Sequence, residues 1–230
     1  MSLLDRFSAA GRRRRQVEQA PEGPLRDLLL TPTDAPDTSV ERLRLLAVDM
    51  ETTGLDPDRD QLLSIGWVPV DGRAVVLGGA GAVLVRSHCD VGDSATIHGI
   101  TDDDLAGGKW LAEALPGLLT ALRGRVLLAH FSQIEEGFLA RACETVYGTG
   151  CSVEAVDTLQ LQRRILGRGF DDLKRGALRL GEARRRYGLP RYRAHDALTD
   201  ALACAELYLA QTEELGHGRR SPLTLRDLQR

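Results

Sequence analysis

Two acidic residues, Asp49 and Glu51, lie two positions apart at the end of an apolar run that begins near Leu43. Because side chains alternate along a strand, both carboxylates would leave the same face of a sheet. Two negative charges this close raise each other's pKa unless a cation lies between them. Carboxylate oxygens are the ligands that Mg²⁺ and Mn²⁺ prefer. Such a pair alone is common on strands, so its interpretation depends on further residues.

A histidine and two aspartates stand at the start of the most regular helical pattern of the chain. Asp196 can cap that helix, which leaves His195 in the preceding loop and Asp200 in the first turn. In one continuous helix His195 and Asp200 would point about 140° apart, whereas the cap lets both face the strand pair. Imidazole titrates near neutral pH and suits a general base. We therefore expect His195 and Asp200 beside the acidic strand end.

Four segments share their order with the motifs of a known enzyme family. They read DMETTGLDP at residues 49–57, IHGIT at 97–101, AHFSQIEEGFL at 129–139 and YRAHDALTDA at 192–201. Together they resemble the DEDDh family of 3′–5′ exonucleases, the DnaQ-like enzymes related to the epsilon proofreading subunit of DNA polymerase III. The resemblance covers about residues 43–212. Its first and third segments are highly specific.

The second segment departs from the family pattern AHNAxFDxxFL. The family aspartate falls on Glu135, and the Asn-Ala pair becomes Phe131-Ser132. Glutamate has one more methylene, so its carboxylate reaches about 1.5 Å further and could replace a water molecule. Glu136 lies about 100° around the helix and is expected to face solvent. Asp157 resembles a family aspartate near the last strand, and we expect a structural role for it.

The resemblance implies the roles of the site residues. The expected catalytic residues are Asp49, Glu51, Glu135, His195 and Asp200. Their four carboxylates would hold two divalent cations, Mg²⁺ or Mn²⁺, with Asp49 shared, and His195 would take the proton from the attacking water. The expected substrate-binding residues are Thr52, Thr53, Gly54, Leu55, His98 and Phe131. The first three would hold the terminal nucleotide through amides and hydroxyls, and His98 would approach its sugar or phosphate.

The fold class expected from the hydrophobic pattern is α/β, with three early strands followed by alternating helices and strands around one mixed sheet. The expected strands are residues 43–51, 61–70, 73–86, 125–130 and the segment that begins at 153. The resemblance implies a ribonuclease H-like fold. Its sheet would have five strands, an antiparallel meander of three plus two parallel strands, flanked by helices.

The chain divides into three expected parts. Residues 1–42 form a basic, proline-containing N-terminal extension of linker-like composition, although PLRDLLL could form a short docking turn. Residues 43–212 form the exonuclease domain, and residues 213–230 form a C-terminal tail. The arginine run at residues 12–15 is equally consistent with a nucleic-acid or partner contact and with a solvated arm.

Charge is segregated along the sequence. The formal net charge is −3, yet residues 163–193 hold eleven Lys or Arg and three Asp or Glu. This predicts a cationic surface for nucleic-acid phosphates, and we expect charge reversal at Arg184 and Arg185 to weaken binding. A solvated helix face is the alternative. Aromatic residues make up only 4% of the chain, so broad base-stacking platforms are not expected.

Cysteine usage and hydropathy bear on location. The four cysteines, Cys89, Cys143, Cys151 and Cys204, include no CxxC pair, so they are expected to be buried apolar residues. That pattern fits a reducing cytoplasm. No apolar run reaches the roughly 18 residues of a membrane span. We therefore expect a cytoplasmic protein without a membrane partner.

The combined expectation is a metal-dependent 3′–5′ exonuclease. Its partner would be a nucleic acid with a free 3′ end, single-stranded DNA being favoured, and a DNA polymerase or repair protein is a second expected partner. One alternative is a catalytically impaired module of the same fold that binds nucleic acid or a polymerase. Another is an RNA-trimming exoribonuclease, because discrimination at the 2′-hydroxyl depends on the shape of the pocket.

Overall fold

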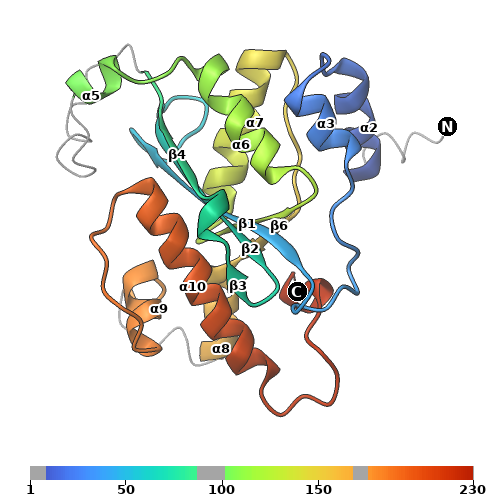
Figure 1. Ribbon diagram of the computed structural model, residues 1–230, viewed down its shortest axis with the longest axis vertical. Coiled ribbons are helices and arrows are strands. Elements are labelled where there is room, and N and C mark those ends of the chain that lie inside the picture. Colours follow the sequence, from blue (N-terminus) through green and yellow to red (C-terminus); the bar gives the residue numbers. More distant parts are fainter. Residues whose placement is uncertain (1–8, 87–101, 168–175, 230) are drawn as a thin grey trace.

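Six strands form one mixed sheet in the computed structural model, which describes residues 9–86, 102–167 and 176–229 (Figure 1). They are β1 (Arg44–Thr52), β2 (Leu62–Asp71), β3 (Ala74–Val75), β4 (Gly81–Leu84), β5 (Val126–Ala129) and β6 (Ala155–Asp157). Strand β2 pairs antiparallel with β1, β3 and β4, whereas β1, β5 and β6 run parallel. The predicted α/β arrangement, an antiparallel meander followed by parallel strands, is confirmed.

The third predicted strand, residues 73–86, is interrupted. It forms β3 and β4 on either side of a 3₁₀ turn, Leu77–Gly79, and both pieces pair with β2. The glycines explain the break, because they weaken a strand and permit close approach. A Cβ on Gly81 would lie 2.4 Å from the Trp67 ring. Counted as one interrupted strand, β3 and β4 complete the five expected strands.

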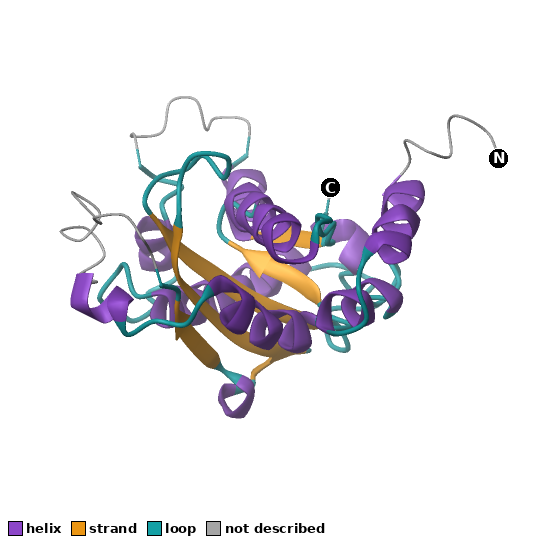
Figure 2. Ribbon diagram, turned by 90° about the horizontal axis from the view of Figure 1, so that it is seen from above, coloured by secondary structure: helices purple, strands orange, loops and turns teal. Residues whose placement is uncertain are grey.

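Helices cover both faces of the sheet (Figure 2). They are α2 (Ala9–Gln19), α3 (Pro24–Leu30), α5 (Asp102–Ala106), α6 (Leu111–Leu122), α7 (Gln133–Tyr147), α8 (Thr158–Leu166), α9 (Leu180–Arg186), α10 (Ala197–Gly216) and α11 (Leu225–Leu228). One core cluster joins the sheet to α3, α6 and α7, and the other joins it to α8, α10 and α11.

Strand β1 divides its side chains between these two clusters. Leu46 and Val48 pack on the α6–α7 face, whereas Leu45 and Ala47 pack on the α10 face. Strand alternation continues this second row through Asp49 and Glu51. Both carboxylates therefore leave the sheet on the face that α10 covers.

The described part of the N-terminal extension packs against the domain. Leu25, Leu28 and Leu29 of α3 are buried in the core, so the linker-like composition of this segment does not reflect its structure. Arg13 donates to the carbonyls of Leu28, Leu29 and Thr31, at the C-terminal end of α3. The predicted domain boundaries after residues 42 and 212 stay predictions.

The C-terminal tail also packs on the domain, where it pairs with the N-terminal extension. The amide of Val40 donates to Leu223, and that of Leu225 donates to Thr38. The two flanks of the domain thus meet next to the start of β1.

Candidate active site

Three potential metal ligands converge at the end of β1. The ligand atoms of Glu51, His195 and Asp200 all lie within 4.8 Å of one another. Glu51 is buried on the strand, Asp200 is half-buried in the first turn of α10, and His195 is exposed in the preceding loop. The expected meeting of the strand end with the start of the helix that follows Asp196, α10, is confirmed.

Local hydrogen bonds fix the start of α10. Asp196 is the N-cap, and its side chain accepts from the Thr199 amide at 2.8 Å, as predicted. The amide of His195 donates to Oδ2 of Asp200 at 2.7 Å. His195 has a φ of 69°, a left-handed conformation that costs energy for a residue with a side chain. Asp200 and the cap together hold the histidine backbone in this conformation.

Gly66 allows α10 to approach the sheet, a role that the sequence analysis missed. It pairs with Asp49 in the register of β1 and β2. A Cβ on Gly66 would lie 2.2 Å from the carbonyl carbon of Ala197, the first residue of α10. A glycine inside a strand is the signal that could have indicated such a close approach.

Glu135 reaches the site from the first turn of α7. It is 5% exposed, and its Oε2 atom has no hydrogen-bond partner among the described residues. Its charge raises the pKa of Asp49, and the charge of Glu51 in turn raises the pKa of Glu135. Glu136 is half-buried, and its Oε1 accepts from the Ser132 hydroxyl at 2.7 Å. The two adjacent glutamates therefore have different surroundings, and Glu135 is the one near the acidic strand end.

The four carboxylates raise one another's pKa. Burial raises the pKa of Asp49 well above its ordinary value, and the charges of Glu135 and Glu51 add to the effect. Burial and the charge of Asp200 raise the pKa of Glu51 to about 7. Burial raises the pKa of Glu135 to about 8, and burial also raises the pKa of Asp200, against the hydrogen bond from His195. Because these four carboxylates are poorly hydrated and repel one another when charged, ionising all of them together costs free energy.

This donor set fits divalent cations. All four groups offer carboxylate oxygens, which suit Mg²⁺ and Mn²⁺. The unpartnered Oε2 of buried Glu135 is an acceptor that a cation would satisfy. Cations would also relieve the repulsion that raises the pKa values of Asp49 and Glu51.

The loop after Glu51 is held by its own hydroxyl groups. Thr52 donates to the carbonyl of Gly54 at 2.5 Å, and the Thr53 hydroxyl bonds to Asp60 and to the Gln61 amide. A Cβ on Gly54 would lie 2.4 Å from the carboxylate of Asp60, so a larger residue there would displace the Asp60 side chain. The two threonine hydroxyls, expected to hold a nucleotide, therefore also stabilise the loop.

Two exposed apolar side chains accompany this site. Leu55 follows the threonine loop and is 73% exposed. Phe131 is 38% exposed and has a φ of 76°, and its amide donates to Oδ1 of Asp157 at 2.9 Å. The same oxygen accepts from Leu159 and caps α8, which fits the structural role expected for Asp157. His98, the remaining expected substrate contact, lies outside the described residues.

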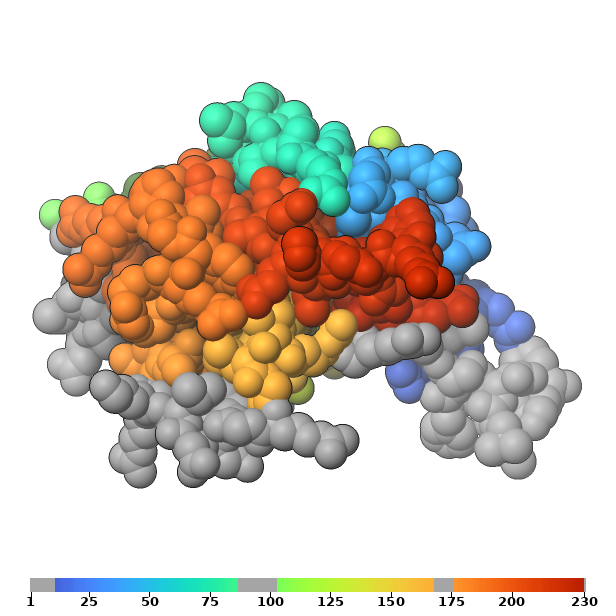
Figure 3. Space-filling view, turned by 90° about the horizontal axis from the view of Figure 1, so that it is seen from below, coloured from blue at the N-terminus to red at the C-terminus, as the bar shows by residue number. Residues whose placement is uncertain are grey.

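The basic stretch is less uniform than its sequence indicates. Arg184 is only 4% exposed and is bonded inside the protein, so its prediction as a surface contact is wrong. Arg185 pairs with Glu182 on the same helix. Arg191 and Arg193 are exposed in the loop that leads to His195. Figure 3 shows α9 and this loop, in orange, at the surface beside α10.

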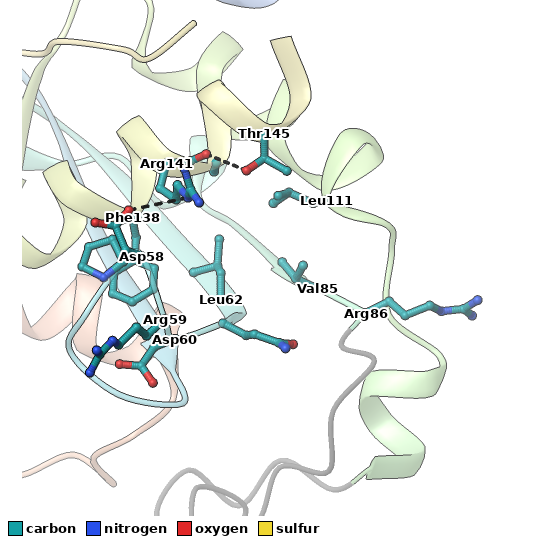
Figure 4. Close-up of a pocket in the computed structure, with 13 residues that line it drawn as sticks. Asp58, Arg59, Asp60, Leu62, Val85, Arg86, Leu111, Phe138, Arg141 and Thr145 are labelled. Carbon is teal, nitrogen blue, oxygen red and sulfur yellow. Dashed lines mark hydrogen bonds and ion pairs between the residues drawn. The ribbon is translucent and has the colours of Figure 1, made fainter. Parts of the chain in front are cut away.

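A separate cleft lies behind the loop of residues 56–61 (Figure 4). Its volume is about 320 Å³. Leu62, Val85 and Phe138 contribute apolar side chains to its lining, and Arg141 on its rim pairs with Asp58. It borders the helix that carries Glu135, but it does not include the acidic residues of the site.

The architecture and the site define a class of protein, the ribonuclease H-like nucleases, in which an acidic strand end faces a helix that carries an aspartate and a preceding loop that carries a histidine. A family model described as Exonuclease (RNase_T) matches residues 46–208, and the chain belongs to this family. The resemblance to DnaQ-like exonucleases is thereby confirmed at the family level.

Curated relatives include proteins of DNA replication. The chain is 29% identical over 178 residues to the PolC-type DNA polymerase III of Thermotoga petrophila, and the match covers 77% of this chain but only 12% of that protein. It is also 29% identical over 168 residues to the DNA polymerase III subunit epsilon of Treponema pallidum, covering 73% of this chain and 76% of that subunit.

Solved structures share the fold at low identity. Exonuclease I of E. coli in complex with a dT13 oligonucleotide has a TM-score of 0.63 and 17% identity, over 76% of this chain and 42% of that one. Exonuclease X in complex with 5′ overhanging duplex DNA has a TM-score of 0.59 and 22% identity, over 81% and 97% of the two chains.

Two further expectations concern cysteines and membranes. Cys143, Cys151 and Cys204 are buried free thiols, as predicted, and Cys89 lies outside the described residues. None of the helices in the described ranges combines the length and apolar character that a membrane span requires.

Proposed function

We propose that this protein is a metal-dependent 3′–5′ exonuclease that hydrolyses the terminal phosphodiester bond of DNA. The observation that carries the proposal is the convergence of Glu51, Asp200 and His195 at the end of β1, with Glu135 buried nearby. At neutral pH, buried acidic residues that oppose one another's ionisation do not stabilise a fold unless a cation lies among them. A site that binds cations explains why they are gathered there.

The carboxylates would bind two cations. Asp49, Glu51 and Asp200 would hold one Mg²⁺ or Mn²⁺, Asp49 would be shared, and Glu135 would hold the second. When bound, the cations supply positive charge that neutralises the charge developing on the phosphate oxygens. The buried, unpartnered Oε2 of Glu135 supports its place in this set.

His195 would act as the general base. It is exposed and lies among the carboxylates, so its ring can reach a water molecule at the scissile phosphate. The bond from its amide to Asp200 fixes its backbone next to the acidic cluster. The proton of the attacking water would pass to the imidazole as the new P–O bond forms and the bond from phosphorus to the 3′ oxygen of the preceding nucleotide breaks, with that oxygen leaving and taking a proton from solvent.

Exposed groups around the site would bind the substrate. Leu55 and Phe131 offer apolar surface to the terminal base. Thr52, Thr53 and Gly54 would hold the terminal nucleotide, as the family resemblance implies. His98 would approach the sugar or phosphate, as the family resemblance implies. Arg191 and Arg193 would hold upstream phosphates without reading sequence.

DNA is the favoured substrate and a DNA polymerase is a proposed partner. Exonuclease I and exonuclease X were solved in complexes with DNA, and two relatives are named as DNA polymerase III proteins. The proposal of a polymerase partner rests on those names. The cytoplasmic location stays a prediction from the cysteine pattern.

The test is hydrolysis of oligonucleotides labelled at the 5′ end. Single-stranded DNA, duplex DNA and RNA are each incubated with Mg²⁺, with Mn²⁺ and with EDTA. We expect a ladder that shortens from the 3′ end, requires metal, and is fastest on single-stranded DNA. Asp200→Asn is the control, because it keeps an acceptor for the His195 amide but removes the charge. Metal-dependent binding without cleavage would instead favour the impaired module, and faster cleavage of RNA would favour the exoribonuclease.

A further inference from the structure

Arg184 is a buried guanidinium that joins three segments around the histidine loop. It belongs to α9 and donates to the carbonyl of Ala203 at 2.6 Å, to that of Pro190 at 2.9 Å, and to Oε2 of Glu206 at 2.7 Å. Ala203 and Glu206 lie on α10, and Pro190 lies in the loop between the two helices. A buried charge without partners destabilises a fold, so all three contacts are needed to compensate for burying this guanidinium.

Tyr192 is attached to the same group. The guanidinium carbon of Arg184 lies 4.7 Å from the centroid of the Tyr192 ring, and the Tyr192 hydroxyl donates to Oε1 of Glu206 at 2.9 Å. Glu206 therefore accepts from the arginine on one oxygen and from the tyrosine on the other. The loop is fastened to α10 both through its backbone at Pro190 and through the side chain at Tyr192.

This attachment lies three residues before His195. On the other side, Asp196 caps α10, so only three residues separate the two anchored positions. The four Cα–Cα steps from Tyr192 to Asp196 span at most about 14 Å, which limits how far the histidine can move. His195 itself is exposed and has a positive φ. Anchors on either side of it add to the bond between its amide and Asp200 in holding this conformation.

We propose that Arg184, Glu206 and Tyr192 are positioning residues that hold the His195 loop over the acidic site. This rests on the proposed role of His195 as general base. We call these three residues the clamp. Because none of the three is placed against the substrate, the clamp changes the fraction of molecules in which the imidazole is correctly placed. It therefore affects kcat. Loss of one hydrogen bond and one cation–π contact should lower that fraction about tenfold.

The neighbouring Arg185 offers a matched control. It has the same side chain on the same helix, but it is 78% exposed and pairs with Glu182. Arg184→Lys keeps the charge but loses the planar fork, so it cannot make the same contacts. We expect Arg184→Lys to lower kcat and Arg185→Lys to leave it unchanged, with KM within about threefold in both variants.

Substitutions at Tyr192 leave the buried guanidinium of Arg184 paired with Glu206. Tyr192→Ala removes the ring and the hydroxyl, whereas Tyr192→Phe removes only the bond to Glu206. On single-stranded DNA with Mg²⁺, we expect Tyr192→Ala to lower kcat about tenfold and Tyr192→Phe to lower it less. Thermal melting of each variant shows whether it is folded. If Tyr192→Ala does not fold, Tyr192→Phe alone provides the test.

A double-mutant cycle separates positioning of His195 from general support of the fold. In a His195→Ala background, the Tyr192 changes should cause no further loss, because the group that they position is gone. Equal losses in both backgrounds, or a normal kcat for the folded Tyr192 variants, would overturn the clamp. The proposed function fails by a different result, in which His195→Ala itself retains full activity.

Discussion

At the scale of single residues, Glu135 and Glu136 show how two adjacent acids acquire different chemistry. Glu135 is buried with an unpartnered oxygen near Asp49, whereas Glu136 is bonded by Ser132 at the helix N-terminus. The sequence motif alone placed an aspartate of the family on Glu135. The burial of the Glu135 side chain supports the alignment of Glu135 with the family aspartate. Comparing variants of Glu135 and Glu136 tests that alignment.

We expect Glu135→Gln to raise the metal concentration needed for half-maximal activity and to lower the maximal rate. The amide keeps the shape but loses the charge that binds the cation. Glu135→Asp should be milder, because a water molecule can bridge the gap of about 1.5 Å left by the shorter side chain. Titrations of activity with Mg²⁺ and Mn²⁺ measure both effects.

Glu136→Gln is the matched control and should be nearly silent, since its oxygen can still accept from Ser132. Greater damage from Glu136→Gln than from Glu135→Gln would show that the alignment is wrong by one residue.

At the scale of elements, the placement of α10 decides whether the site forms. Most elements could be predicted from hydrophobic periodicity, and the Asp196 cap with Asp200 in the following turn could be read from spacing alone. The closeness of α10 to β2 could not, because it depends on Gly66, which lies far from α10 in the sequence.

The same limit applies to Arg184. In the sequence it is one of three consecutive arginines, and only the packing of α9 on α10 buries it while Arg185 stays exposed. Local composition likewise made residues 1–42 resemble a linker, although Leu25, Leu28 and Leu29 are buried in the core. Sequence patterns show the periodicity of a helix or strand. The burial of Arg184 and of the α3 leucines depends instead on which elements pack against each other in the folded protein.

We expect Gly66→Ala to lower kcat at least tenfold while the protein stays folded. The added Cβ would lie 2.2 Å from the backbone of Ala197, so the start of α10 would shift and carry His195 and Asp200 with it. Overpacking of this kind costs about 1–3 kcal/mol, and a displacement of about 1 Å in a catalytic site can cost about 10²-fold in rate. Kinetics and thermal melting measure the two effects.

Gly78→Ala is the control for this prediction. Gly78 lies in the 3₁₀ turn of the same sheet, and a Cβ there would meet no atom within 4 Å in the described structure. If Gly66→Ala retained the activity of Gly78→Ala, the close approach of α10 would not matter for catalysis.

At the scale of the whole molecule, the arginines around the site should set the salt dependence of binding. We expect Arg191→Gln with Arg193→Gln to weaken binding of all single-stranded sequences alike, because phosphate contacts carry no sequence information. Each lost contact should lower the slope of log Kd against log salt by about 0.7. Fluorescence anisotropy at several salt concentrations, with Ca²⁺ to prevent cleavage, gives the slope.

Arg185→Gln tests the same expectation for Arg185, which is exposed and pairs with Glu182: a lowered slope would mean that it also contacts phosphates, and an unchanged slope that it does not. A slope that is the same in the double variant and the unmodified protein would mean that Arg191 and Arg193 are merely solvated.

The acidic cluster also makes the stability of the whole molecule depend on pH and metal. Burial and neighbouring charges raise the pKa of Glu51 to about 7 and that of Glu135 to about 8, from ordinary values of 4.5. The folded protein therefore binds these protons more tightly than the unfolded chain does. Without metal, the stability that these groups contribute is full below about pH 4.5 and is lost as the pH rises through about 7 to 8.

We therefore expect the melting temperature in EDTA to fall between pH 6 and pH 8.5, and added Mg²⁺ to restore it most at the higher pH, where the carboxylates are ionised. Glu135→Gln removes one of the titrating carboxylates of the cluster, so in EDTA at pH 8.5 it should melt a few degrees higher than the unmodified protein. About 1 kcal/mol corresponds to about 2–4 °C in a domain of this size. Glu136→Gln, which lies outside the buried cluster, should melt like the unmodified protein. Scanning calorimetry across this pH range would contradict the electrostatic account if the metal-free melting temperature were constant, or if Glu135→Gln melted no higher than Glu136→Gln.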